Sequence, residues 1–135
     1  MDFHLREAVK SDMTGVWALI NELAVFEKEP QAVEVSIADL ERDGFGSNPL
    51  FHCFVAEKSA GEIVGIALFY PRYSTWKGPV IHLEDLIVTQ QMRGLGLGKA
   101  LYKAVMVYAH AQKVRRVEWV VLDWNESAIE FYKHT

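Results

Sequence analysis

Apolar and polar residues follow two periodicities along this chain. Alternation over a few residues, as over 3–8, is typical of half-buried strands, and apolar recurrence every three or four positions, as over 16–23, is typical of amphipathic helices. The predicted elements are, in chain order, a strand over 3–8, a helix capped by Ser11 and Asp12 that fades near Phe26, a helix over 36–44, strands over 51–57, 63–70 and 80–88, a helix from Lys99 through Ala109, a strand over 116–122 and a helix over 128–133.

The connections between these elements set the expected topology. Ser36 to Asp39 resembles a capping box that opens the second helix, and Gly44 is expected to end that helix. A turn after Ser59 joins two strands into an antiparallel pair, and residues 71–79 are expected to form a loop. The segment from Val80 to Leu122 predicts a parallel strand–helix–strand crossover. The fold class is therefore α/β, with a mixed and mostly antiparallel sheet.

The segment from Arg93 to Gly98 lies between a predicted strand and a predicted helix. Glycines at 94, 96 and 98 let the backbone adopt positive φ and turn its N–H groups inward, and the helix adds its positive N-terminal end. This pattern predicts an anion cradle, most simply for a pyrophosphate, with a plain tight turn as the alternative. No Gly-Lys-Ser/Thr follows, which excludes a Walker loop, and the late position in the chain disfavours a Rossmann fingerprint.

Composition limits the class of protein further. With 135 residues, 50% of them apolar and 24% charged, we expect one domain spanning 1–135. The sequence has no apolar run of ~18 residues and no signal-peptide leader, so we expect a cytoplasmic protein with no membrane partner. The net charge of −4, without a basic block, disfavours nucleic acid. Cys53 is expected to be a buried free thiol, and the five histidines lack metal-ligand spacing, so neither a metal site nor a catalytic histidine is expected.

The Arg-x-x-Gly-x-Gly pattern of Arg93, Gly96 and Gly98 resembles the signature of the GNAT acyltransferase superfamily. Other segments resemble its diamine acetyltransferase branch, which includes spermidine/spermine-type enzymes. Two of them, Ser-Thr-Trp-Lys-Gly and Leu-Asp-Trp-Asn, are most similar to the thialysine acetyltransferases. The matching segments cover nearly the whole chain and are residues 22–27, 43–46, 49–53, 73–78, 83–85, 122–125 and 131–133.

This resemblance implies the GNAT fold and an N-acetyltransferase. The enzyme would move the acetyl group of acetyl-CoA to a primary amine of a small diamine, polyamine or thialysine-like amino acid, by direct attack in a ternary complex. The resemblance also implies a homodimer. Relatives continue beyond the Phe-Tyr-Lys helix with a glycine and two further strands, whereas this chain stops at Thr135, so the domain is expected to be C-terminally incomplete.

Two residues receive catalytic roles through this resemblance. A primary amine with a pKa near ~10.4 is almost entirely protonated at pH 7, so a base assists the transfer. Glu84 matches the base or amine-orienting residue, and Asp85 is its local support; strand alternation predicts that the two carboxylates point to opposite faces. Tyr132 matches the general acid that protonates the leaving thiolate. From the residues alone, a solvent-facing or ion-paired Glu84 and a core-packing Tyr132 are the alternatives.

Acetyl-CoA is expected to contact three segments. Backbone groups over 86–88 would pair with the pantetheine arm if the strands over 80–88 and 116–122 splay apart. Arg93 and Lys103 are candidates for the adenosine phosphate, with a solvated helix face as the alternative for Lys103. The expected cofactor-binding residues are Leu86, Ile87, Val88, Arg93, Gly94, Leu95, Gly96, Leu97, Gly98, Lys99, Asn125, Glu126, Ser127, Ala128 and Tyr132.

Amine recognition falls to a third group of residues. Glu27 is expected to meet the far ammonium of a diamine, with a plain helix-end position as the alternative. Phe26 stands where spermidine/spermine-type relatives carry Tyr, which fits a short amine such as thialysine, and Trp76 is a candidate pocket wall. The expected substrate-binding residues are Phe26, Glu27, Trp76, Glu84, Asp85, Glu118, Trp119 and Val120.

Two other functions stay open at this level. One keeps the reaction but moves the acceptor to a protein lysine or a peptide N-terminus; an open groove in place of an acidic, Trp-lined pocket would favour it. The other is a non-catalytic fragment that binds acyl-CoA or a partner chain without turnover.

Overall fold

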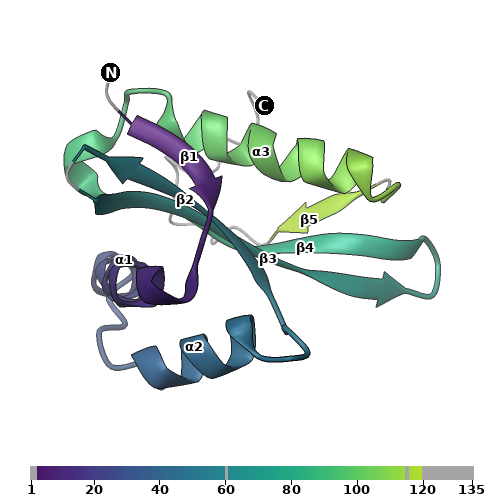
Figure 1. Cartoon of the computed structure of the whole chain (residues 1–135), viewed down its shortest axis with the longest axis horizontal. Coiled ribbons are helices and arrows are strands. Elements are labelled where there is room, and N and C mark those ends of the chain that lie inside the picture. The colour runs from purple at the N-terminus through teal and green to yellow at the C-terminus, as the bar shows by residue number, and fades with distance from the viewer. Residues whose placement is uncertain (1–2, 60, 115, 120–135) are drawn as a thin grey trace.

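The computed structural model describes residues 3–59, 61–114 and 116–119 and shows a sheet with helices on both faces (Figure 1). Among these residues, no helix combines the length and the apolar character needed to cross a membrane. The elements are β1 (Phe3–Glu7), the 3-10 helix η1 (Lys10–Asp12), α1 (Met13–Phe26), α2 (Ile37–Phe45), β2 (His52–Lys58), β3 (Glu62–Ser74), β4 (Gly78–Val88), the 3-10 helix η2 (Gln90–Met92), α3 (Leu97–Ala111) and β5 (Val117–Trp119).

The sheet has the strand order β1-β2-β3-β4-β5. The first four strands pair antiparallel to their neighbours. β5 pairs parallel to β4, because α3 carries the chain back across one face of the sheet between them. The prediction of a mixed, mostly antiparallel sheet with one parallel crossover is therefore confirmed.

Two apolar cores hold the helices against opposite faces of the sheet. On one face, α3 buries Leu101 and Val105 against a cluster that includes Phe69. On the other face, α1 and α2 pack over a second cluster that includes Val16 and Ile66. Figure 1 shows this arrangement, with α3 on one side of the sheet and α1 and α2 on the other. β4 lies between the two cores and carries the chain into the glycine segment that follows it.

α2 begins as predicted but does not end at Gly44. The Ser36 hydroxyl accepts from the Asp39 N–H at 3.0 Å, and the Asp39 carboxylate accepts from the Ser36 N–H at 2.9 Å, which confirms the capping box. The predicted end is wrong, because α2 continues to Phe45. A Cβ at Gly44 would lie 2.4 Å from Cζ of Phe51. The glycine therefore makes room for an aromatic ring instead of ending the helix.

The start of α1 also differs from the prediction. Asp12 precedes the helix without making a side-chain cap. Its carboxylate instead accepts hydrogen bonds from both terminal nitrogens of Arg6, at 2.7 and 2.9 Å, and from the Val9 N–H at 2.7 Å. Asp12 is thus used to join β1 to the first turn before α1.

The predicted loop over 71–79 is wrong for most of its length. β3 continues to Ser74, and β4 begins at Gly78, so the two strands form a long hairpin that extends beyond the rest of the sheet (Figure 1). Most side chains at 71–77 are exposed. Because neither face of this hairpin is buried, no alternation of apolar and polar residues marks it in the sequence.

Candidate active site

The segment between β4 and α3 contains the predicted glycine loop. Gly94 and Gly96 have φ angles of 80° and 82°, in the left-handed region that favours glycine. The expectation of positive φ at Gly98 is wrong, because Gly98 already belongs to the first turn of α3. A Cβ at Gly94 or Gly96 would meet nothing within 4 Å. The backbone conformation, and not crowding, therefore requires glycine at these two positions.

The N-terminal end of α3 gives this loop a positive electrostatic character. The first N–H groups of an α-helix have no intrahelical acceptor, and the helix dipole adds to their partial positive charge. The first turn of α3 contains no acidic side chain, and Lys99 is exposed there. The loop from Gly94 to Lys99 therefore fits a pyrophosphate, whose oxygens would accept hydrogen bonds from these N–H groups.

Two contacts with α1 fix the position of the glycine loop. The Glu22 carboxylate accepts hydrogen bonds from the Thr89 hydroxyl at 2.9 Å and from the N–H of the next residue at 3.0 Å. The Arg93 guanidinium lies 5.1 Å from the centroid of the Phe26 ring, and its Nε donates to the Val88 carbonyl at 3.2 Å. Arg93 thus ties the loop to the end of α1, whereas the sequence suggested a phosphate contact.

β4 connects the glycine loop to the predicted catalytic residues. One edge of residues 86–88 pairs with β3. On the opposite edge, the pairing with β5 covers Ile81 to Leu83 within the described part of the chain. Side chains at 86–88 are divided between the two cores, because Leu86 packs toward α3 and Ile87 packs toward α1. Pairing of this backbone with the pantetheine arm stays a prediction.

A β-bulge in β4 decides where the two predicted carboxylates point. Consecutive β3 residues 68–69 pair with Asp85 and Leu83, so Glu84 is an extra residue in β4 with no opposite partner. Leu83 and Leu86 both pack toward α3 although they are three positions apart. The prediction that Glu84 and Asp85 point to opposite faces is therefore wrong. The bulge interrupts the alternation, and both carboxylates lie on the face opposite α3.

Glu84 contacts two residues that the sequence analysis did not assign to the site. Its side chain is 50% exposed, and its Oε1 accepts a hydrogen bond from the Tyr70 hydroxyl at 3.3 Å. His82 Nε2 lies 3.4 Å from the same oxygen. The only sequence signal for His82 is its spacing of two residues from Glu84 on one strand. Tyr70 has no such signal, because its contact depends on the register between β3 and β4.

Glu84, Asp85 and Glu27 form an acidic cluster near the end of α1. Burial raises the pKa of Asp85 to about 6, and the negative charges of Glu84 and Glu27 add to this rise. Burial also raises the pKa of Glu27. In the described part of the chain, no Lys or Arg forms an ion pair with any of the three. The cluster therefore offers unneutralised negative charge, which favours a bound ammonium group.

Glu118, a predicted substrate residue, is engaged elsewhere. Its Oε1 accepts hydrogen bonds from Nε of Arg72 at 3.1 Å and from Nη2 of the same guanidinium, and its Oε2 lies 3.3 Å from Nε of Arg116. These guanidinium groups, Arg72 foremost, lower the pKa of the Glu118 carboxyl. The charge of Glu118 is thus already neutralised within the sheet.

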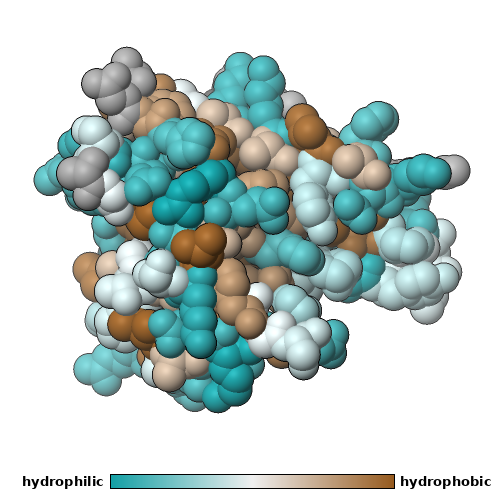
Figure 2. All heavy atoms as spheres, in the orientation of Figure 1, coloured by the Kyte–Doolittle hydropathy of each residue, from teal (hydrophilic) through white to brown (hydrophobic). Residues whose placement is uncertain are grey.

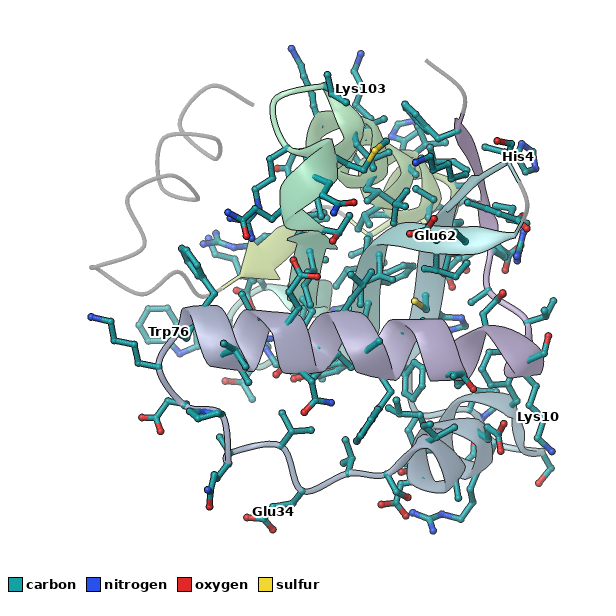
Figure 3. The ribbon with its side chains drawn as sticks, turned by 90° about the vertical axis from the view of Figure 1, so that its left-hand side faces the viewer. His4, Lys10, Glu34, Glu62, Trp76 and Lys103 are labelled. Carbon is teal, nitrogen blue, oxygen red and sulfur yellow. The ribbon has the colours of Figure 1, made fainter. Side chains whose placement is uncertain are left out.

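Two other predicted residues are exposed away from the acidic cluster. Trp76 is 91% exposed in the turn between β3 and β4. Glu84 lies six positions along β4 from Gly78, the strand residue that follows this turn, a distance of roughly 20 Å. Lys103 points away from the outer side of α3 (Figure 3), which matches the alternative of a solvated helix face. The face in Figure 2 is largely polar, with apolar side chains scattered over it.

Several predicted site residues lie outside the described part of the chain, so their roles stay predictions. The side chain of Trp119 is likewise outside what the structure describes, and its role also stays a prediction. The other residues concerned are Val120, Asn125, Glu126, Ser127, Ala128 and Tyr132.

Cys53 is buried as expected. Within residues 3–59, 61–114 and 116–119, no cluster of three or more His, Cys, Asp or Glu could hold a metal ion.

The fold and the site together define a class of protein. A mixed sheet delivers one strand into a glycine loop at a helix N-terminus, and the same strand carries paired carboxylates at a bulge. This combination is that of an acyltransferase of the GNAT type. The chain belongs to the acetyltransferase (GNAT) family, whose model matches residues 15–135. The predicted family is therefore confirmed.

Three proteins of known name or structure show how similar this chain is to individual acetyltransferases. The chain is 43% identical to thialysine N-epsilon-acetyltransferase of Mus musculus, over 96% of this chain and 80% of the mouse protein. It is 40% identical to spermidine/spermine N(1)-acetyltransferase-like protein 1 of Homo sapiens over 96% of its length, but spans only 20% of that protein. A solved aminoglycoside acetyltransferase from an uncultured soil metagenomic sample is 19% identical and has a TM-score of 0.82, over 98% of this chain and 86% of that one, so it shares the fold.

Proposed function

We propose that this chain transfers the acetyl group of acetyl-CoA to a primary amine of a small diamine, polyamine or thialysine-like amino acid. The observation that carries this proposal is the unneutralised acidic cluster of Glu27, Glu84 and Asp85, because Glu84 and Asp85 lie on the strand that leads into the glycine loop. With its pyrophosphate on the loop, acetyl-CoA would then reach the acceptor ammonium bound at the carboxylates along the C-terminal half of β4. The names of the mouse and human relatives support an amine acceptor.

Acetyl-CoA would bind as a co-substrate along β4 and the glycine loop. The loop from Gly94 to Lys99 would hold the pyrophosphate through backbone N–H groups. The backbone of residues 86–88 would pair with the pantetheine arm, and residues 125–128 would supply a second contact. This placement would bring the thioester toward Glu84, because the arm would run back along β4 from the loop.

The acidic cluster would then prepare the amine for attack. The bound ammonium gives one proton to Glu84, directly or through one water, and the neutral nitrogen attacks the thioester carbonyl carbon. The C–N bond forms, the C–S bond breaks as the tetrahedral intermediate collapses, and the thiolate takes a proton from Tyr132. The nitrogen loses its second proton in the same collapse, and this proton passes to the Tyr132 phenolate, directly or through water, so that the one proton released overall is the one taken up by Glu84. Asp85 supports the charge of the ammonium before transfer, since a bound cation lowers the raised pKa of that carboxyl.

Residues near the end of α1 would select the amine. Glu27 would bind the far ammonium or α-amino group of the acceptor, and Phe26 would line the path beside it without offering a hydroxyl. A short amine such as thialysine fits these features better than a long polyamine. We further propose a cytoplasmic homodimer by analogy with the family, which light scattering and fractionation would test.

The direct test is release of free thiol from acetyl-CoA with thialysine, lysine, putrescine, spermidine and spermine. We expect saturable release with one short amine. Glu27→Gln should raise KM for that amine ~10-fold, since it loses a charge-assisted contact, and the matched control Glu29→Gln, at an exposed position two residues on, should not. No release with any amine, while acetyl-CoA still raises Tm, would refute catalysis and favour an acyl-CoA-binding fragment.

A further inference from the structure

We infer that Tyr70 and His82 are positioning residues that hold one carboxylate oxygen of Glu84 and leave the other oxygen for the amine. This inference rests on the proposed function, in which Glu84 receives the proton of the acceptor. Tyr70 on β3 and His82 on β4 both lie outside the segments of this sequence that resemble the family.

The geometry places both residues on the same oxygen. Tyr70 and His82 are directly opposite each other in the β3–β4 pair, and their ring centroids lie 5.1 Å apart. The Tyr70 hydroxyl donates to Oε1 of Glu84 at 3.3 Å, and Nε2 of His82 lies 3.4 Å from that atom. His82 and Glu84 flank Leu83, which packs toward α3, so the ordinary alternation of a strand places both of their side chains on the opposite face.

The second oxygen of Glu84 is the one left for chemistry. In the part of the chain that the structure describes, no hydrogen bond or ion pair reaches Oε2. A half-exposed glutamate otherwise samples several rotamers, and holding it in one costs side-chain entropy. Two contacts at Oε1 supply that restraint in advance. Oε2 is therefore presented to the amine, or to its water, without a reorganisation step.

The surroundings of His82 direct its Nε2 toward Glu84. Arg72 on β3 faces this region, and Glu118 on β5 is opposite His82 in the register. Glu118 is already paired with Arg72 and Arg116, so it does not need the imidazole. Asp85 and Glu27 are the remaining acidic groups of this face. Nε2 of His82 therefore has Oε1 of Glu84 as its acidic neighbour, at 3.4 Å, and the contact is an ion pair when the imidazole is protonated.

Hydrogen bonds to an ionised carboxylate favour its charged form. Loss of either donor should therefore shift the acidic limb of the kcat/KM profile to higher pH. Burial and the neighbouring Glu84 charge raise the pKa of the Tyr70 hydroxyl, so it keeps its proton and stays a donor across this range.

The experiment compares Tyr70→Phe, His82→Phe and His82→Gln in amine acetylation, with the affinity for CoA measured in parallel. We expect Tyr70→Phe and His82→Phe each to lower kcat ~10-fold, the effect of one lost hydrogen bond to a charged group. Their acidic limbs should move up by roughly half a pH unit or more. His82→Gln keeps an N–H donor and should restore most of kcat. Tyr73→Phe and His4→Gln, at exposed positions, are the controls.

Two outcomes of the kinetic comparison would overturn the inference. One is unchanged kcat and an unchanged acidic limb in both phenylalanine variants of an active enzyme. The other is an equal loss of kcat, CoA affinity and Tm, which indicates packing alone. A ¹³C NMR measurement of the Glu84 carboxyl resonance separates this inference from the proposed function, because it needs no turnover. The resonance must change in both phenylalanine variants even if no amine is acetylated, and an unchanged resonance contradicts the inference.

Discussion

Replacing Gly96 by alanine should damage both the stability of the chain and its affinity for CoA. Gly96 has φ of 82° and is the N-cap of α3. An alanine in this region of φ/ψ space strains the native state by ~1–2 kcal/mol. Alanine also lowers the conformational entropy of the unfolded chain, which offsets ~0.4–1 kcal/mol of this strain. Because a Cβ there would meet nothing within 4 Å, no packing clash adds to this cost. The expected net loss is ~1 kcal/mol, or a Tm lower by ~4 °C.

Gly78 provides a matched control for this strain. Its φ is 81°, a Cβ there would also meet nothing within 4 Å, and it lies at the start of β4 in the distal hairpin. Gly78→Ala should therefore lose a similar ~1 kcal/mol. It should leave CoA binding unchanged, because the glycine loop is at the other end of β4.

Calorimetric titration with CoA distinguishes the two variants. If Gly96→Ala relieves its strain by rotating the peptide, one donor to the pyrophosphate is lost, and Kd rises ~10- to 100-fold. Gly96→Asn should bind more tightly than Gly96→Ala, since asparagine tolerates the left-handed region. Equal CoA affinity in Gly96→Ala and Gly78→Ala, despite equal losses of Tm, would refute the assignment of the loop as an anion cradle.

Two further predictions concern stability. Gly44→Ala should lower the free energy of unfolding by ~1 kcal/mol in urea titrations, because crowding of the Phe51 ring (~1–3 kcal/mol) exceeds the gain in helix propensity (~1 kcal/mol). Asp85 has a pKa of about 6 in the native state against an ordinary 3.8, so the native state favours its neutral carboxyl. The free energy of unfolding is therefore highest below pH 3.8 and falls as the pH rises from 3.8 through 6. Asp85→Asn should remove this loss of up to ~3 kcal/mol, as urea titrations at several pH values would measure.

Clear outcomes would contradict these two predictions. A stabilised Gly44→Ala variant would mean that helix propensity outweighs the contact with Phe51. If the crowding is real, Gly44→Ala should cost less stability when it is made together with Phe51→Leu than when it is made alone. For Asp85, parallel stability curves of the wild type and Asp85→Asn between roughly pH 4 and pH 7 would mean that its native pKa is not raised.

The sequence predicted best the elements that bury one face. β4 and α3 fill the two cores with apolar side chains, and the order of strands and helices through β5 was predicted correctly. The hairpin over 71–79 was missed because both of its faces meet solvent. Gly44 was assigned to a helix end because glycine is common there, whereas its real constraint is a ring seven residues further along the chain. Contacts of this kind leave no periodic signal.

The candidate site shows the same division. The glycine loop could be found from its own motif, and Glu84 was assigned through the resemblance of its segment to the family. The bulge at Glu84 could not be found, because it depends on the register between β3 and β4. The same is true of the contact from Tyr70 and of the pairing between Arg72 and Glu118, which are 46 residues apart. Sequence patterns identify residue types, while the register decides which of them meet.

In the proposed reaction, an amine that loses its proton to Glu84 receives the acetyl group. The most direct measurement is mass spectrometry of the amine after incubation with acetyl-CoA and the chain, with Glu84→Gln as the matched variant. We expect an N-acetylated product with the wild type. With Glu84→Gln we expect the product to form ~10²-fold more slowly at unchanged CoA affinity, since general base catalysis contributes this much. Equal product formation by both proteins would contradict the role of Glu84, and no product from either would contradict the proposed reaction.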